Sequence, residues 1–368
     1  MNLRPAITSV GPLLDEIRGS LGASATWAGL LTTLPGLCFA AAGLTAPLLA
    51  RKAGLGRAIT IALMVLAAGL IIRVTDGPWV VIGGTLVATA GIALINVLIP
   101  VVIKGSFPAR VGLMTGIYTA ALQGGGALGS AVTPPLETSF GGWRAALASW
   151  AALALVALAV WLLVERRLPK LTPSATTGEK RSLIRNRLAW TVTLFFGFQS
   201  FLAYVMMGWL PLVFIDNGVS KATAGLLVGL TSLIAVPISI FIAPLAARSR
   251  SQSAWIIALG VIGFGGVIGL LVAPAAAPLL WSILVGLGMS VFSLALTVIA
   301  LRARTTEDTA QLSGMAQGFG YLLAGVGPFL FGILHDVTHG WTVPLIMVMV
   351  VYLAQMTFGA LAGRNRYV

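Results

Sequence analysis

The sequence predicts an all-α membrane protein with twelve transmembrane helices in two pseudo-symmetric six-helix halves. Of the 368 residues, 58% are hydrophobic and only 9% are charged, whereas soluble domains carry about 25% charged residues. Apolar segments of about 20 residues, the length that crosses a bilayer core, recur along the whole chain. The basic residues gather in alternate gaps between these segments. Lipid is therefore the expected solvent.

The expected spans fall into two groups of six. The first group comprises residues 1–17, 26–50, 57–74, 79–103, 109–134 and 143–164. The second group comprises residues 189–215, 221–247, 253–273, 277–301, 309–334 and 341–362. Residues 165–188 contain prolines, serines and threonines without apolar periodicity. We therefore expect an N-terminal half (1–164), a linker (165–188) and a C-terminal half (189–368).

Charge placement predicts the orientation. Eighteen of the 23 basic residues lie on the side of the linker, and only Arg18, Arg73, Arg144 and Lys221 lie on the opposite side. An excess of Lys and Arg marks cytoplasmic loops. We therefore expect a multi-pass protein of the inner or plasma membrane, with the linker and the C-terminus in the cytoplasm. Because the basic residues form no continuous stripe, no nucleic-acid partner is expected.

The first span is short. Met1 to Leu14 corresponds to about 21 Å of helix, less than the bilayer core of about 30 Å. Our hypothesis is that Met1 lies inside the first helix of a longer natural product.

The two halves repeat the same local sequence. Residues 24–31 (SATWAGLL) open the second span, and residues 220–227 (SKATAGLL) open the eighth. The exits match as well, since Ala-Pro-Leu followed by an arginine stands at 46–51 and again at 243–248. Parallel six-helix halves are typical of secondary transporters.

Arg4 is the only charged side chain deep in an expected span. It lies eleven residues inward from Asp15, or about 16 Å, close to the bilayer midplane. An arginine at that depth needs a partner or a wet cavity. It favours a fixed positive charge for an anionic or strongly polar substrate, and Thr8 shares its helix face. The alternative is a structural ion pair or carbonyl cap, although no intramembrane carboxylate is expected.

Other polar side chains fall at a similar depth in five further helices. The candidate substrate-binding residues besides Arg4 and Thr8 are Asn96, Tyr118, Gln123, Gln199, Tyr204, Ser290, Ser293, Gln317 and Tyr321. Uncharged polar groups in a bundle usually hydrogen-bond between helices. Lining of a cavity and interhelical bonding therefore both remain open for each of them.

Small residues and prolines cluster in the fifth and eleventh spans, which occupy matching positions in the two halves. The candidate hinge or packing residues are Gly124, Gly125, Gly126, Pro134, Gly325, Gly327 and Pro328. Small residues allow close helix approach, and proline allows a kink. A hinge for alternating access and tight static packing are equally compatible with this pattern.

The sequence lacks the residues that several kinds of activity require. The spans contain no deep carboxylate or histidine for a coupling proton, no Walker motif and no catalytic triad. Cys38 is the only cysteine, and His335 and His339 alone are a weak metal pair. We expect no enzymatic activity, no metal and no cofactor. An intramembrane enzyme and a ligand-binding receptor that does not transport remain as rivals.

The first fifty residues resemble a known family. Residues 2–14 (NLRPAITSVGPLL), together with 32–35 (TTLP) and 46–48 (APL), look like the signature of the cyanate and 2-nitroimidazole transporter family of the major facilitator superfamily. The resemblance implies that the first, fourth, seventh and tenth helices line a central cavity, with the fifth and eleventh contributing. Residues 51–57 (RKAGLGR) keep the glycines and bases of the superfamily loop but lack its acidic residue.

The resemblance and the unpaired Arg4 together predict a secondary transporter that works by alternating access. Its expected partners are the lipid bilayer and a small-molecule substrate, either a small anion such as cyanate or a nitroaromatic compound. A multidrug-type exporter of neutral aromatics is the alternative. We expect a monomer, and the direction of transport and the coupling ion are left open.

Overall fold

The computed structural model describes residues 2–23, 25–165 and 183–368, and all regular elements in this part of the chain are helices. The N-terminal elements are α1 (Pro5–Thr8), η1 (Gly11–Leu13), α2 (Leu14–Leu21), α3 (Ala25–Ala53), α4 (Leu55–Ile72), α5 (Pro78–Ser106), η2 (Pro108–Arg110), α6 (Val111–Phe140) and α7 (Trp143–Glu165). The C-terminal elements are η3 (Leu183–Arg185), α8 (Arg187–Asp216), α9 (Lys221–Arg248), α10 (Ser253–Val272), α11 (Pro278–Met289), α12 (Val291–Arg302), α13 (Thr306–Thr338) and α14 (Thr342–Ala362). The all-helical prediction is confirmed.

Most of these helices are suited to a bilayer. In the described residues, nine spans are long and apolar enough to cross a membrane, with α11 and α12 counted together, and α3 is a bent tenth. The remaining two of the twelve expected spans are the broken first segment and α6, which is rich in glycine, proline and threonine. Large apolar side chains such as Trp79, Leu226 and Val272 are exposed. Such a surface is stable against lipid rather than water.

The first span is not the single helix over residues 1–17 that the sequence predicted. Helix α1 ends at Thr8, and the chain continues through η1 into α2. Pro12 has no N–H to donate to the carbonyl of Thr8, four residues earlier, so the α-helical ladder is interrupted. Ser130 in α6 donates its hydroxyl to that carbonyl at 3.4 Å. A neighbouring helix thus satisfies the group that the proline frees.

The predicted span 277–301 is also divided. Helix α11 ends at Met289 and α12 begins at Val291, with Ser290 between them at φ −65° and ψ −11°. Gln199 in α8 donates from Nε2 to the carbonyl of Met289 at 3.0 Å. A side chain from another helix thus supplies a hydrogen-bond donor at the break, where the regular backbone hydrogen bonds of the α-helix are interrupted.

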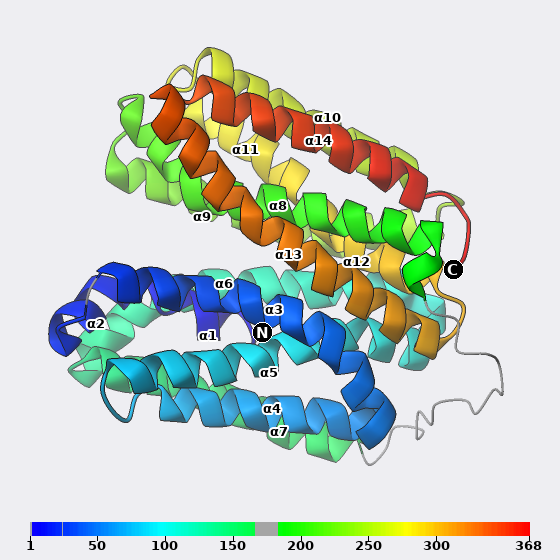
Figure 1. The fold of residues 1–368 in the computed structure, drawn as a ribbon, viewed down its shortest axis with the longest axis horizontal. Coiled ribbons are helices and arrows are strands. Elements are labelled where there is room, and N and C mark those ends of the chain that lie inside the picture. Colours follow the sequence, from blue (N-terminus) through cyan, green and yellow to red (C-terminus); the bar gives the residue numbers. More distant parts are fainter. Residues whose placement is uncertain (1, 24, 166–182) are drawn as a thin grey trace.

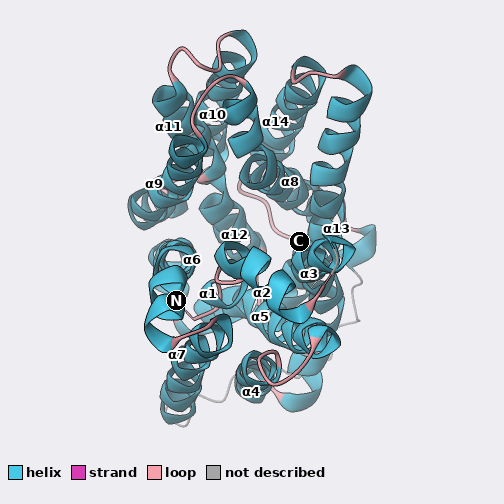
Figure 2. Ribbon diagram, turned by 90° about the vertical axis from the view of Figure 1, so that its left-hand side faces the viewer, coloured by secondary structure: helices cyan, strands magenta, loops and turns pink. Residues whose placement is uncertain are grey.

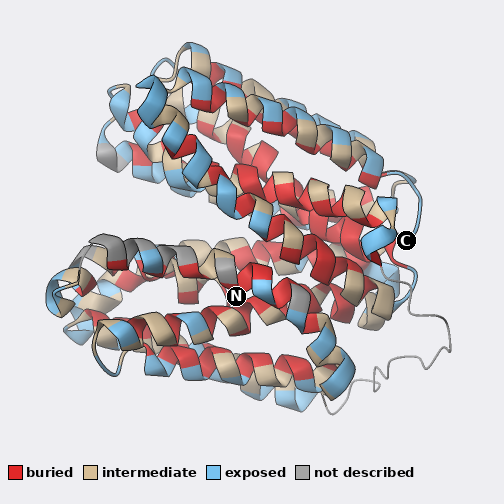
Figure 3. Cartoon of the chain, in the orientation of Figure 1, coloured by how far each residue is buried: buried red, intermediate tan, exposed pale blue. Residues whose placement is uncertain are grey.

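The helices form two groups that converge at one end. Figure 1 shows α1–α7 below and α8–α14 above, and the ribbons approach each other where residues 165 and 183 flank the grey trace and where the C-terminus lies. We call this the linker end, and the other, where the groups diverge, the far end. Figure 2, turned by 90°, places α3 beside α13 and α6 beside α9. Buried residues concentrate where the groups meet (Figure 3).

Candidate functional site

Arg4 directly precedes α1, which lies about midway between the two ends of the bundle (Figure 1). Its side chain is half-buried. Among the described residues, the guanidinium has no hydrogen-bond or ion-pair partner. Tyr118, Tyr204 and Tyr321 lie near enough to Arg4 for its positive charge to act on their phenol groups. Because Tyr118 belongs to α6 and the other two to α8 and α13, the free charge of Arg4 acts at the boundary between the two groups of helices.

Aromatic rings surround Tyr321 at this depth. Phe39 of α3 stacks on Tyr321 with ring centroids 4.8 Å apart, and this contact joins the two groups of helices. Phe196 meets the same ring edge-on at 5.2 Å, and Tyr204 lies 6.1 Å away. Phe39 and Phe196 were not among the sequence candidates, because a phenylalanine in an apolar span has no signal that separates a binding wall from ordinary packing.

Asn96 connects Tyr118 to α13. The Tyr118 hydroxyl donates to Oδ1 of Asn96. Gln317 donates from Nε2 to the carbonyl of Asn96 at 3.1 Å and to Oγ of Ser313 at 2.9 Å. Ser313 in turn donates to the carbonyl of Val97 at 2.8 Å. The amide of Gln317 thus joins the two groups of helices and is committed to protein partners.

Gln199, Ser290 and Ser293 gather at the break between α11 and α12. The two serine hydroxyls donate to carbonyls of their own segment, at 2.9 Å and 3.0 Å. All three side chains are buried. Among the described residues, none of them interacts with Arg4, so their hydrogen bonds serve the broken helix.

Thr8 and Gln123 complete the predicted set. The Thr8 hydroxyl donates to the carbonyls of Arg4 and Gly126, at 3.1 Å and 2.9 Å. Gln123 is half-buried in α6, and among the described residues its amide has no hydrogen bond. It is therefore a free polar group on the helix that also carries Tyr118.

A pocket of about 270 Å³ extends from Thr8 toward the far end. Its wall combines apolar side chains with the hydroxyls of Thr8, Thr85, Thr89 and Ser130. Thr85 is buried, and its hydroxyl has no partner within the described part of the chain. None of the ten lining residues is charged. The pocket suits a small, uncharged polar or aromatic group.

The predicted hinge residues occupy different environments. A methyl at Gly126 would lie 3.6 Å from Cβ of Arg4, and one at Gly327 would lie 3.0 Å from the ring of Phe201, whereas one at Gly325 would meet nothing within 4 Å. The carbonyl of Pro328 accepts from Nε1 of Trp209 at 3.0 Å. Gly124, Gly125 and Pro134 lie inside the continuous helix α6. Gly327 thus serves close packing, whereas a methyl at Gly126 would fit at an ordinary contact distance, and a hinge role stays a prediction.

The sequence matches the family described as Major Facilitator Superfamily over residues 5–328. The chain belongs to this superfamily. It is 39% identical to the 2-nitroimidazole transporter of Escherichia coli (strain K12), over 99% of this chain and 93% of the relative. It is 40% identical to the uncharacterized transporter YycB of Bacillus subtilis (strain 168), over 100% and 92%. It is 31% identical to the cyanate transport protein CynX of E. coli (strain K12), over 92% and 88%.

Solved structures agree on the fold. The proton:xylose symporter XylE matches with a TM-score of 0.77, covering 100% of this chain and 95% of that one at 14% identity. The E. coli fucose:proton symporter FucP matches at 0.76, covering 99% and 97% at 12% identity. The predicted fold, the cyanate and 2-nitroimidazole family and the absence of an enzyme function are confirmed. The protein is a multi-pass membrane transporter.

In this transporter the two groups of helices touch through glycines near the linker end. A methyl at Gly43 of α3 would lie 2.7 Å from the carbonyl of Gly314 in α13, and Pro47 packs on Gly314. The pair α6 and α9 repeats this contact, since a methyl at Gly112 would lie 3.0 Å from Cα of Pro244. Pro47 and Pro244 are the matching prolines of the sequence repeat. The closed linker end thus depends on backbone proximity at two related places.

Two further arginines are buried, which the sequence did not predict. Arg73 was expected at the end of the span 57–74, on the side opposite the linker, and its side chain is 0% exposed and donates to the carbonyls of Ala6 at 2.6 Å and Leu147 at 3.4 Å. Arg302 donates to Oε1 of Gln252 and to the carbonyl of Arg364. Arg73 directly follows α4 and Arg302 ends α12, so both stand at helix ends and the prediction that Arg4 is the only charge deep in a span stays a prediction. Unlike Arg4, however, both of these guanidiniums have partners.

The loop after α3 receives its acidic group from another helix. Glu165, at the end of α7, accepts from the Thr60 hydroxyl at 2.7 Å, and a methyl at Gly56 would lie 3.0 Å from the Glu165 carboxyl carbon. Residues 51–57 lack an acid, as the sequence showed, but the fold brings one to Gly56. Sequence proximity alone could not reveal this, because the two residues are 109 positions apart.

Proposed function

We propose that this transporter moves a small anion, or a small molecule with a nitro or carboxylate group, by alternating access. The observation that carries the proposal is the guanidinium of Arg4, which has no hydrogen-bond or ion-pair partner among the described residues and lies near tyrosines of both groups of helices. A charge with no protein partner in an apolar bundle is costly. A planar acceptor such as a nitro group, a carboxylate or cyanate supplies the missing interaction.

The aromatic rings favour a planar substrate. Phe39, Phe196 and Tyr204 surround Tyr321, and an aromatic ligand would gain stacking and edge contacts there. Two relatives are named for 2-nitroimidazole and for cyanate; the first is a small planar ring that could stack here, and the second is a small linear anion. The uncharged pocket beside Thr8 supports a second candidate function, the export of neutral aromatics.

The arrangement of the contacts between the two groups of helices supports alternating access. The glycine contacts of α3 with α13 and of α6 with α9 lie near the linker end, while the groups diverge at the far end (Figure 1). Substrate would reach Arg4 from the far end in this state and leave after the glycine contacts separate. We propose that the linker end is cytoplasmic, in the plasma membrane, and that the monomer is sufficient.

The test uses the purified protein, Arg4→Gln and the matched control Arg187→Gln, whose side chain is exposed at the linker end. Each is heated with cyanate, a nitroaromatic acid or neutral 2-nitroimidazole, because a ligand at 100 times its Kd adds about 2.7 kcal/mol of stability. Ligands that bind are then measured for flux into proteoliposomes.

We expect anions to stabilise and cross with the wild type and the control but not with Arg4→Gln. Equal stabilisation of all three proteins by neutral 2-nitroimidazole alone would show that Arg4 is structural and would favour the neutral-aromatic function. Binding without flux of any ligand would favour a receptor and contradict transport.

A further inference from the structure

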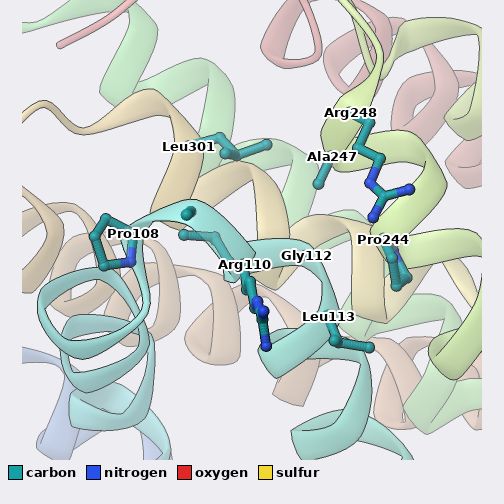
Figure 4. Close-up of a pocket in the computed structure, with 10 residues that line it drawn as sticks. Pro108, Arg110, Gly112, Leu113, Pro244, Ala247, Arg248 and Leu301 are labelled. Carbon is teal, nitrogen blue, oxygen red and sulfur yellow. The ribbon is translucent and has the colours of Figure 1, made fainter.

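A second pocket, of about 300 Å³, lies between the two groups of helices at the linker end. One wall comes from η2 and the start of α6, and the other from the ends of α9 and α12. Figure 4 shows Arg110 on the first wall and Arg248 on the second. A ligand bound here would therefore touch both groups of helices at once.

The pocket is strongly positive. Arg110 and Arg248 are its only charged lining residues, and none of the ten lining residues is acidic. Neither guanidinium has a hydrogen-bond or ion-pair partner in the described part of the chain. Helix α6 starts at Val111, and its first turn has neither an acidic residue nor a side-chain cap. The free N–H groups and the positive end of the helix dipole add to the two arginines.

The related junction on the other side of the bundle is built differently. There α13 starts with Glu307 and Asp308 in its first turn, and Thr305 and Asp308 form a capping box. The protein itself therefore supplies negative charge and a cap at the start of α13. At the start of α6 it supplies neither, and the two arginines there, both exposed, have no partner among the described residues. Topology alone accounts for basic residues at this end, but not for their position on the two walls of one pocket that no acidic residue lines.

We propose that this pocket binds a phosphate group through Arg110, Arg248 and the N-terminus of α6, and that bound phosphate stabilises the closed linker end. Arginine and helix N-termini both suit phosphate oxygens. The group comes from a phospholipid headgroup or from soluble phosphate. In either case the anion bridges the two groups of helices, so their separation must break its contact with one arginine. This inference does not depend on the substrate or on Arg4.

The first test measures thermal stability in lipid-free detergent. The wild type, the double variant Arg110→Gln/Arg248→Gln and the control Arg185→Gln/Arg187→Gln are titrated with sodium phosphate against sodium chloride of equal ionic strength. The control removes two exposed arginines from the same end. We expect the half-saturating phosphate concentration to rise at least about ten-fold in the double variant only, because a hydrogen bond to a charged group is worth this factor or more.

The second test distinguishes the sources. Spin labels at Arg57→Cys and Arg250→Cys, with Cys38→Ala, report the distance between the two groups at the linker end in nanodiscs of phosphatidylglycerol or of a neutral glycolipid. A lipid source predicts a larger short-distance population with phosphatidylglycerol, lost in the double variant. A soluble source predicts the same change on addition of phosphate to glycolipid nanodiscs. If the double variant and the control respond alike to lipid and to phosphate, the proposal is overturned.

Discussion

An alanine at Gly43 would push the two groups of helices apart at the linker end. The added methyl would lie 2.7 Å from the Gly314 carbonyl and would overlap the backbone of Gly318. Overpacking of this kind costs about 1–3 kcal/mol. The cost falls on the conformation in which α3 touches α13, and every 1.4 kcal/mol is a tenfold change in an equilibrium. We therefore expect the ratio of closed to open linker ends to fall between about 5-fold and about 140-fold.

The matched control is Gly36→Ala on the same helix, where a methyl meets nothing within 4 Å. The distance between spin labels at Arg57→Cys and Arg250→Cys, with Cys38→Ala, reports the population. Gly43→Ala should gain a longer distance, whereas Gly36→Ala should match the parent. If Gly43→Ala loses thermal stability but keeps the parent distance distribution, the contact is static packing and does not control access.

Three further changes test the buried polar contacts. Arg73→Lys should lower the free energy of unfolding by about 1.5–3 kcal/mol, because one ammonium cannot keep both carbonyl contacts, and thermal unfolding measures the loss. Trp209→Phe should cost about 0.5–1.5 kcal/mol, because Pro328 loses its hydrogen bond from the indole, and the same assay applies. Ser130→Ala should lower the free energy of unfolding by a similar amount, because the Thr8 carbonyl beside the proline break loses its donor. The same change should weaken ligand binding, and a calorimetric titration measures the affinity.

Each change has a matched control elsewhere in the chain. Arg57→Lys alters an exposed arginine, and Trp79→Phe alters an indole that is 74% exposed. Ser149→Ala removes a hydroxyl that bonds only within its own helix. Equal losses in a variant and its control would contradict the hydrogen-bond assignment for that site.

The sequence predicts a structural feature well when neighbouring residues determine that feature. Pro12 stands in the first span and breaks it, so the break could have been anticipated from the missing N–H. Ser290 stands at a second break that has no proline, and there the decisive partner is Gln199, 91 positions away. Arg4 was singled out because its depth follows from simple helix rise. Arg73 was not, because a residue at the end of an apolar run gives no indication of whether its side chain turns into the bundle.

The sequence by itself determined that this chain is a helical membrane protein of two related halves, and it predicted a charge at mid-depth. The length of the spans and the charge of the loops are set by the bilayer. The repeat around Pro47 and Pro244 can be read directly from the sequence, so none of these three features requires knowledge of the packing. Only the tertiary structure decided which polar groups remain free. Gln317 bonds to Asn96, and Arg73 and Arg302 bond to carbonyls, whereas Arg4 has no hydrogen-bond partner in the described part of the chain. The physical reason is that hydrogen-bond partners depend on the approach of helices that are distant in the sequence.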